Sequence, residues 1–315
     1  MPAHAASALT VGYLGPAGTF TEQALRSQSD LAAARQVMYE TMPDVLDAVA
    51  AGEIDLGFVA IENSIEGTVH LTQDGLVFNH DLLIVREVVL DVQLCLLAKA
   101  GTALTDVTSV WSIPVATSQC TAFLHKELGS ARLQVANSTA EAAERVGKDD
   151  AKGQAAIGTA RAAELYGLEI LATDIADADG NQTRFVVISR DGIPAPTGHD
   201  KTTVVVYQKA DVPGSLISIL QEFAARRINL SKLESRPTKS GGLGDYCFVL
   251  DAVGHINDEI MADCLRSLKA KQGGVKFLGS YPAAGHSAES ARAHADAAWA
   301  EADDWVESLR ARVVD

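Results

Sequence analysis

The stretch "DLGFVAI", residues 55–61, carries the clearest signal of the fold. After Asp55 its residues are almost all apolar, without a polar residue at every second position. A strand covered by helices on both faces of a sheet has this composition, whereas a strand with one solvated face alternates. The segment therefore predicts a buried strand of an α/β protein.

Strand and helix patterns alternate on both sides of this segment. Threonine followed three residues later by an acid, the spacing of a capping box, predicts helix starts at Thr19–Glu22 and Thr41–Asp44. Further helices are expected over residues 114–128, from Ser138 with Glu141, and over 160–166. The strands expected between them are "LTVGYLG", "RQVMY", "SVWSI", "RLQVA", "AAIG", "LEILATD" and "RFVVIS". This layout is typical of α/β domains over residues 10–190.

A second pattern begins after "DGIPAPTGHD", residues 191–200, whose two prolines and two glycines indicate a linker. Residues 201–281 then follow the order β-α-β-β-α-β, which is the ferredoxin-like arrangement. Residues 282–315 have helical propensity and are expected either to pack on a neighbouring subunit or to form a frayed tail. Residues 1–9 are expected to be a flexible N-terminus.

The charge of the chain narrows the possible partners. The 315 residues carry 26 Lys and Arg against 41 Asp and Glu, a formal net charge of −15. This excess argues against a nucleic-acid partner, since phosphates require basic patches. A small anionic ligand would need a local site built from a few placed cations, and Arg184 is a candidate for such a role.

Several other classes of protein are disfavoured. "MPAHAASALT" lacks the basic and apolar regions of a signal peptide. The longest apolar stretch, "LLIVREVVLDVQLCLLAKA", is interrupted by charges and is expected to form two strands and no membrane span. The cysteines show no C-x-x-C spacing, so we expect buried reduced thiols in a cytoplasmic protein and no metal cluster. The cysteines are Cys95, Cys120, Cys247 and Cys264.

Two polar motifs mark a candidate site. "AIENSIEGTV" (60–69) places Glu62, Asn63 and Ser64 at the end of a buried strand, where ligands of open α/β sheets bind. "NQTRF" (181–185) places polar residues before a strand, so this strand must run opposite to its neighbours to share the cleft. The alternatives are an Asn/Ser turn with a solvated Glu62, and a surface salt bridge for Arg184.

The glycines of "YLGPAGTF" (13–20) suggest a third contribution to this site. Gly12, Gly15 and Gly18 do not form G-x-G-x-x-G, so dinucleotide binding is disfavoured. Their spacing favours a tight turn that offers backbone N–H groups at a helix N-terminus, where anions bind. A plain strand–helix turn remains the alternative.

These segments together resemble a known family. "GYLGPAGTFTEQAL", "IENSIEGTV", "SQCTAFL" and "NQTRF" are similar, in this order, to the landmarks of prephenate dehydratase. "PGSL" (213–216) and "ESRP" (234–237) resemble the phenylalanine-binding motifs of its ACT domain. The resemblance covers residues 10–281 and implies a monofunctional enzyme. The chain departs from the family at "SIPV", where Ile113 and Val115 replace polar residues.

The resemblance implies a fold and a reaction. The expected fold is a two-lobed α/β catalytic domain, similar to type II periplasmic binding proteins, with an ACT regulatory domain. The expected reaction converts prephenate to phenylpyruvate, water and CO2 in phenylalanine biosynthesis, without a cofactor or metal. Two alternatives remain open: an arogenate dehydratase, and a non-catalytic amino-acid sensor of the same architecture.

The same resemblance implies roles for the polar motifs. Thr183 would face the departing hydroxyl, Arg184 would bind a carboxylate, and Phe185 would stack on the substrate ring. Glu62 is a rival proton donor if burial raises its pKa. The residues expected to orient the substrate are Asn63, Ser64, Asn181 and Gln182, with backbone groups of Gly18 and Thr19.

In the ACT domain, L-phenylalanine is expected to bind between two subunits and to inhibit the enzyme. The protein would then be a homo-oligomer, a dimer or tetramer, paired through these domains. The residues expected at the allosteric site are Pro213, Gly214, Ser215, Leu216, Asn229, Leu230, Glu234, Ser235, Arg236 and Pro237.

Overall fold

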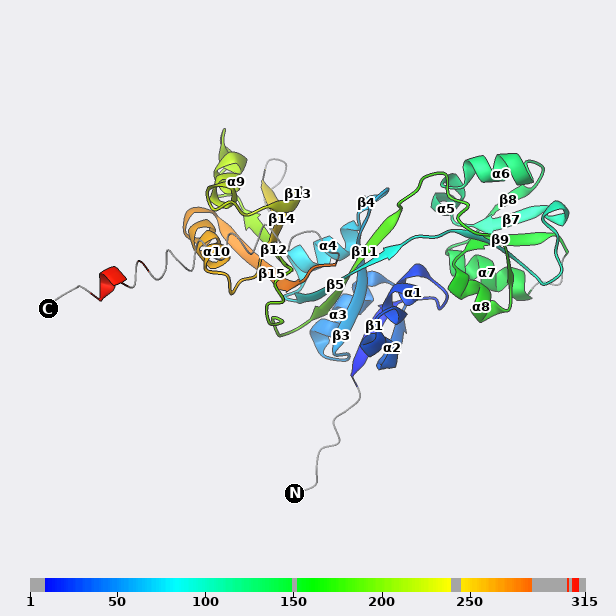
Figure 1. Ribbon diagram of the computed structural model, residues 1–315, viewed down its shortest axis with the longest axis horizontal. Coiled ribbons are helices and arrows are strands. Elements are labelled where there is room, and N and C mark those ends of the chain that lie inside the picture. Colours follow the sequence, from blue (N-terminus) through cyan, green and yellow to red (C-terminus); the bar gives the residue numbers. More distant parts are fainter. Residues whose placement is uncertain (1–8, 149–151, 239–244, 285–304, 306–307, 312–315) are drawn as a thin grey trace, which may run out of the picture. The chain divides into compact units, whose positions relative to one another are not determined.

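A computed structural model describes residues 9–148, 152–238, 245–284, 305 and 308–311. The chain divides into two compact units, residues 1–192 and 193–315 (Figure 1). The expectations for the N-terminus and for the C-terminal tail fall mostly outside the described residues.

The first lobe of unit 1 is a mixed sheet with helices on both faces. Its strands follow the order β2-β1-β3-β11-β5, and the short β4 pairs with β3. β1, β2 and β3 are parallel, whereas β11 is antiparallel to both β3 and β5. The strands are β1 (Thr10–Leu14), β2 (Arg35–Tyr39), β3 (Leu56–Asn63), β4 (Gly67–Thr68), β5 (Leu83–Asp91) and β11 (Gln182–Ser189). Residues 56–61 of the stretch thus form the predicted strand, with Phe58 and Val59 fully buried.

The helices of the first lobe are α1 (Phe20–Arg26), α2 (Ser29–Ala33), α3 (Met42–Ala51), α4 (His70–Asp74) and the π-helical turn η1 (Gly75–Asn79). α3 begins with the predicted capping box between Thr41 and Asp44. α1 has only half of the expected box: Thr19 Oγ1 accepts from the Glu22 N–H, but the Glu22 carboxylate accepts from Gly18. Glu22 therefore fixes the loop that precedes its helix.

The second lobe of unit 1 is a five-stranded sheet of order β10-β6-β9-β7-β8. Its two apolar cores lie on opposite faces, one under α6 and the other under α7 and α8 (Figure 1). The strands are β6 (Cys95–Ala98), β7 (Ser109–Ser112), β8 (Arg132–Val135), β9 (Gln154–Gly158) and β10 (Glu169–Ala172). The helices are η2 (Leu104–Asp106), α5 (Pro114–Ser118), α6 (Thr121–Leu128), α7 (Thr139–Lys148) and α8 (Ala160–Tyr166).

The helix expected over residues 114–128 is in fact two helices, because the chain breaks at Gln119 and Cys120. Asp177, from a distant segment, donates its N–H to the Gln119 carbonyl at 2.6 Å. Its carboxylate accepts from the Ala122 N–H at 2.9 Å and so caps the start of α6. This tertiary contact sets Gln119 at a helix junction.

The chain crosses between the two sheets twice, after β5 and before β11. The apolar stretch predicted as two strands forms β5 in one sheet and β6 in the other. The two crossings meet where the Val92 N–H donates to the Asn181 carbonyl at 2.7 Å. Two α/β lobes joined by crossing strands are the architecture of type II periplasmic binding proteins, so this part of the predicted fold is confirmed.

Unit 2 has the predicted ferredoxin-like arrangement. Its antiparallel sheet has the order β13-β14-β12-β15, and α9 and α10 pack against one apolar core. The elements are β12 (Asp200–Tyr207), α9 (Ser215–Ala225), β13 (Leu230–Pro237), β14 (Tyr246–Val253), α10 (Glu259–Lys271) and β15 (Gly274–Pro282).

The cysteines are in the state expected from the sequence. All four cysteines are free and buried. Burial is the main reason, and the nearby Asp177 carboxylate the second, that the pKa of the Cys120 thiol is raised to about 12, so this thiol stays protonated at neutral pH.

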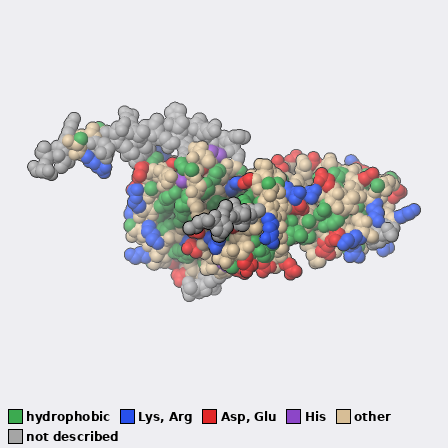
Figure 2. Space-filling view, turned by 90° about the horizontal axis from the view of Figure 1, so that it is seen from below, with side chains coloured by type: hydrophobic (Ala, Val, Ile, Leu, Met, Phe, Trp, Pro, Cys, Tyr) green, Lys and Arg blue, Asp and Glu red, His purple; other side chains and the backbone are tan. Residues whose placement is uncertain are grey.

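Acidic and basic side chains are interspersed over the face shown in Figure 2. Among the described residues, no helix combines the length and the apolar character that a membrane span requires.

Candidate active site

The two polar motifs meet where β3 ends and β11 begins. Antiparallel pairing places Thr183 opposite Asn63 and Arg184 opposite Glu62. The carboxyl end of β3 and the amino end of β11 therefore lie at one edge of the sheet. The predicted reversal of this strand is confirmed, and it brings segments about 120 residues apart into contact.

Asn63 is oriented by the turn that follows it. Its side-chain oxygen accepts from the backbone N–H groups of Ile65 and Glu66, at 2.9 and 3.0 Å. Its Nδ2 must then face the other way, and it donates to Asn181 Oδ1 at 2.8 Å and to Thr183 Oγ1 at 3.0 Å. The backbone thus determines which end of this amide meets Thr183.

The same polarity continues into the second lobe. Asn181 is buried, and because its Oδ1 is an acceptor, its Nδ2 donates to Gln119 Oε1 at 3.1 Å. Gln119 Nε2 then lies 3.4 Å from the Glu66 carboxylate. Asn63, Asn181 and Gln119 form a continuous set of hydrogen bonds between the lobes, which we call the amide chain.

Thr183 is the end point of the amide chain. Its hydroxyl oxygen accepts from Asn63. Among the described residues, no acceptor takes the proton of this hydroxyl, so the proton can be donated to a ligand. The arrangement makes Thr183 a candidate hydrogen-bond donor at the mouth of β11.

Arg184 lies on the other face of β11, because successive side chains of a strand point in opposite directions. Its Nε is 2.7 Å from Glu87 Oε2 on β5, and its Nη1 is 3.3 Å from Glu62 Oε2 on β3. Together, the guanidinium and the two carboxylates have a formal net charge of −1. Arg184 is therefore held by these two acids, and its expected role in binding a substrate carboxylate stays a prediction.

Phe185 also differs from its expected role. Its side chain is 1% exposed and stacks on Phe58, with ring centroids 5.2 Å apart and planes at 15°. Both rings belong to the core beneath α1 and α2. The expectation that Phe185 stacks on a substrate ring is not met, because the protein interior already covers this ring.

Ser64 and Gln182 hold the loops of the site together. Ser64 Oγ accepts from the Gln182 N–H at 2.9 Å and lies 3.4 Å from the Gly180 carbonyl. The Gln182 side chain donates to the Asp91 carboxylate at 2.8 Å. These two residues are the first pair in the register of β11 and β5. Both residues are close to the site, and these contacts are with other protein groups.

The loop at residues 15–19 is fixed between the lobes. Gly18 donates its N–H to Glu22 at 2.5 Å, and its carbonyl accepts from Thr159 Oγ1 of the second lobe at 2.7 Å. Tyr166 donates to the Ala17 carbonyl at 3.2 Å. The Gly18 N–H is thus not an open anion donor as expected, and Thr19 Oγ1 serves as the cap of α1.

Three residues of this region were not predicted as site residues from the sequence: Gln119, Thr159 and Glu87. Gln119 belongs to the segment "SQCTAFL", which resembles a family motif, but the sequence gives no sign that its partner is Asn181. Glu87 had a weaker signal, a carboxylate inside the apolar stretch of residues 82–91.

Unit 2 brings part of the predicted allosteric set together. A pocket of about 450 Å³ is lined by Gly214, Ser215 and Leu216 from the start of α9 and by Ser235 from β13, against Phe248. Pro213 lines a neighbouring hollow. Besides Pro213, the predicted residues that do not line the 450 Å³ pocket are Asn229, Leu230, Glu234, Arg236 and Pro237. Strand alternation explains part of this, since Glu234 and Arg236 point away from the face that Ser235 occupies.

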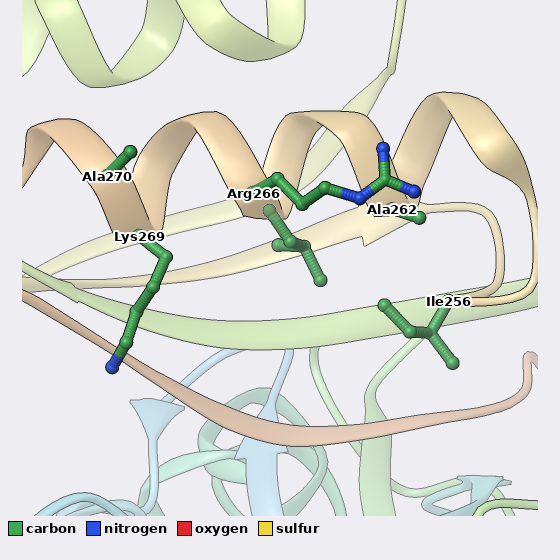
Figure 3. A pocket seen from close by; sticks show the side chains of 6 residues that line it. Ile256, Ala262, Arg266, Lys269 and Ala270 are labelled. Carbon is green, nitrogen blue, oxygen red and sulfur yellow. The ribbon is translucent and has the colours of Figure 1, made fainter.

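A second pocket of unit 2 lies along α10 (Figure 3). Its lining combines the apolar side chains of Ile256, Ala262 and Leu265 with the basic Arg266 and Lys269. None of the predicted site residues lines it.

Comparison with known proteins agrees with both units. The family model for prephenate dehydratase matches residues 11–193, and the model for the ACT domain matches residues 202–270. The prephenate dehydratase of Mycolicibacterium vanbaalenii is 41% identical, over 95% of this chain and 98% of that protein.

Two solved structures are also similar. Prephenate dehydratase from Arthrobacter aurescens, solved in complex with L-Phe, has a TM-score of 0.83 and 40% identity over 96% of this chain and 99% of that chain. A protein described as a novel type of quorum quenching acylase has a TM-score of 0.77 and 31% identity over 87% and 98% of the two chains.

Proposed function

The chain belongs to the prephenate dehydratase family, and we propose that Thr183, oriented by the amide chain, assists the departure of the hydroxyl from prephenate. The enzyme converts prephenate to phenylpyruvate, water and CO2. The observation that supports the role of Thr183 is its hydrogen bonding: the oxygen accepts from Asn63, and among the described residues no acceptor takes the hydroxyl proton.

The chemistry of the reaction suits such a site. As the ring carboxylate leaves as CO2, its bonding electron pair enters the ring, and the ring C–O bond breaks at the other end. Aromatisation of the ring supplies the driving force. The protein must hold the breaking bonds in line and donate a hydrogen bond or proton to the departing oxygen, an effect that contributes about 10²–10⁴-fold.

A threonine hydroxyl is a weak acid, so we assign Thr183 hydrogen-bond polarisation of the leaving group and not full proton transfer. The departing hydroxide then takes from solvent the proton that converts it to water. Asn63, Asn181 and Gln119 would orient both Thr183 and the substrate. Glu62 was the rival donor. Its carboxyl oxygen Oε2 lies 3.3 Å from Arg184 Nη1 and is thus directed to the guanidinium, which favours Thr183.

Asn181→Asp tests the direction of the amide chain. A carboxylate cannot donate to Gln119 Oε1, so the chain would lose its connection between the lobes. We expect kcat to fall about 10-fold or more. This corresponds to about 1.4 kcal/mol of activation free energy, which is at the lower end of the cost of leaving a buried polar group without its hydrogen bond.

The matched control for this variant is Asn79→Asp, the same change on an exposed residue at the end of η1. Steady-state kinetics with prephenate give kcat for both variants. A kcat of Asn181→Asp equal to that of Asn79→Asp would exclude the amide chain from the mechanism.

We further propose that L-phenylalanine inhibits the enzyme through unit 2. The pocket at the start of α9 combines an apolar wall with a first helical turn, whose N–H groups have no intrahelical acceptor. The Ser215 N–H already donates to the Val212 carbonyl at 3.1 Å, so the N–H groups that follow it are those that suit a carboxylate. The relative from Arthrobacter aurescens was solved with L-Phe. We place the enzyme in the cytoplasm, as a homo-oligomer joined through its ACT domains.

Gly214→Val tests the regulatory pocket. Gly214 caps α9 with a φ of +91°, a conformation that a β-branched residue adopts only with strain, and the new side chain would border the pocket. We expect the L-Phe concentration for half inhibition to rise at least about 10-fold, within the 5–150-fold range of typical allosteric coupling.

Gly198→Val is the matched control, because Gly198 has the same φ of +91° and open space around it but lies in the linker. This variant should keep its inhibition. Calorimetry should show the same contrast in L-Phe binding, and normal binding by Gly214→Val would move the effector to another site.

The acylase relative raises amide hydrolysis as a second activity. Acyl transfer by a hydroxyl needs a base beside the nucleophile. Ser64 Oγ is bonded to backbone groups and Thr183 Oγ1 to an amide, and among the described residues neither contacts a histidine. The site therefore favours the dehydratase reaction.

Mixing the protein with prephenate and following phenylpyruvate absorbance in alkali tests the function. A non-catalytic sensor would give only the spontaneous rate. The ratio of kcat/KM for prephenate and arogenate distinguishes the two dehydratase activities.

A further inference from the structure

The two acids that bind Arg184 come from the strands on either side of it. Glu62, on β3, is directly opposite Arg184. On β5 the residue opposite Arg184 is Val89, and Glu87 lies two residues away on the same face. Three charged side chains of alternating sign thus lie side by side across β3, β11 and β5.

Glu87 is the most deeply buried of the three. Its side chain is 1% exposed, against 11% for Arg184 and 35% for Glu62. A carboxylate in such a position is costly unless it is paired and hydrogen-bonded. The pairing is provided by Arg184 Nε, at 2.7 Å.

The contact with Nε has a geometric consequence. A guanidinium is planar, so a carboxylate bound at Nε fixes the plane in which the terminal nitrogens lie. Nη1 is then directed to Glu62, at 3.3 Å. Glu62 is the neighbour of Asn63, and Arg184 is the neighbour of Thr183, so this arrangement restrains the strand ends that carry the amide chain and the hydroxyl.

We propose that Glu87 is a positioning residue of the dehydratase site: it holds the Arg184 guanidinium against Glu62 and so fixes the ends of β3 and β11 in the geometry that the reaction needs. This inference rests on the proposed function. Small displacements of aligned groups can cost about 10²-fold in rate. The loss of Glu87 should therefore lower kcat more than it raises KM.

The test uses the full chain with Glu87→Gln, which keeps the size of the side chain and removes its charge. We expect kcat to fall about 10-fold or more with KM changed by less than about 3-fold, the pattern of an interaction that matters in the transition state. Circular dichroism should show a folded protein.

Asp30→Asn is the matched control. It breaks the exposed ion pair of Arg86, the residue that precedes Glu87 on β5, which has two N–H···O contacts at 2.9 and 2.8 Å. This variant should keep the kcat of the unaltered protein.

The double variant Glu87→Gln with Arg184→Gln shows whether Glu87 acts through Arg184. If it does, the double variant should have a kcat within about 2-fold of Arg184→Gln alone, because the two residues then act as one unit. Multiplied losses would overturn the proposal, and so would a Glu87→Gln protein with a normal kcat and only a lowered melting temperature.

If Glu87→Gln does not fold, Glu87→Asp can replace it, because aspartate keeps the charge but is one methylene shorter. The kcat of Glu87→Asp combined with Arg184→Gln is then compared with that of Arg184→Gln alone, and the same outcomes support or overturn the proposal. Failure of the proposed function would look different. In that case the unaltered protein would form no phenylpyruvate from prephenate, whatever the variants did.

Discussion

Replacing Thr183 by alanine is expected to lower kcat by at least about 10²-fold, roughly 2.7 kcal/mol of activation free energy. The variant removes the hydroxyl whose oxygen accepts from Asn63 and whose proton is available to the departing oxygen of the substrate. Thr183 is only partly buried, so the free energy of unfolding should change little. Phenylpyruvate formation measured by absorbance gives kcat, and thermal melting gives the stability.

Two further substitutions at this position separate the hydroxyl from the shape of the side chain. Thr183→Ser keeps the hydroxyl and should lose much less activity, whereas Thr183→Val keeps the shape and should behave as the alanine variant does. Equal losses in the serine and alanine variants would remove the hydroxyl from the mechanism.

Replacing Phe185 by alanine should affect stability above all. The ring is buried in the core of the first lobe and stacks on Phe58 at 5.2 Å, so its removal leaves a cavity. Such changes cost about 3–5 kcal/mol of the free energy of unfolding. Denaturant unfolding of the variant and of the unaltered protein measures the difference.

Phe58→Ala provides the comparison, because Phe58 is the stacked partner and is fully buried. It should cost a similar amount, and the double variant should cost less than the sum, since both single variants remove the same ring contact. A Phe185→Ala protein of normal stability that has lost activity would show instead that the ring faces the substrate.

Much of the architecture could be predicted from local patterns. The capping box at Thr41 and Asp44, the apolar run at 55–61 and the βαββαβ order of the second unit each depend on neighbours in the sequence, and each is present in the structure. The motifs at 62–64 and 181–184 were also correctly predicted to lie together. Their polarity at strand ends is a local signal, and antiparallel pairing brings them into register.

The functions of the individual side chains could not be predicted in the same way. Thr183, Arg184 and Phe185 are consecutive, yet one joins the amide chain, one is bound by two carboxylates and one fills the core. Strand alternation explains why Thr183 and Arg184 face opposite sides. It does not say which side is open to a ligand, because that depends on the helices and strands that cover each face.

The sequence by itself determined the class of fold, the order of its elements and the family, because these follow from the periodicity, caps and motifs of contiguous segments. Only the tertiary structure decided that Gln119 meets Asn181, that Glu87 meets Arg184 and that the Gly18 N–H is bound by Glu22. The first two contacts join residues more than 60 positions apart. Their formation depends on strand register and on the packing of two lobes, which are set by the sum of many burial and hydrogen-bond free energies and not by any short stretch of sequence.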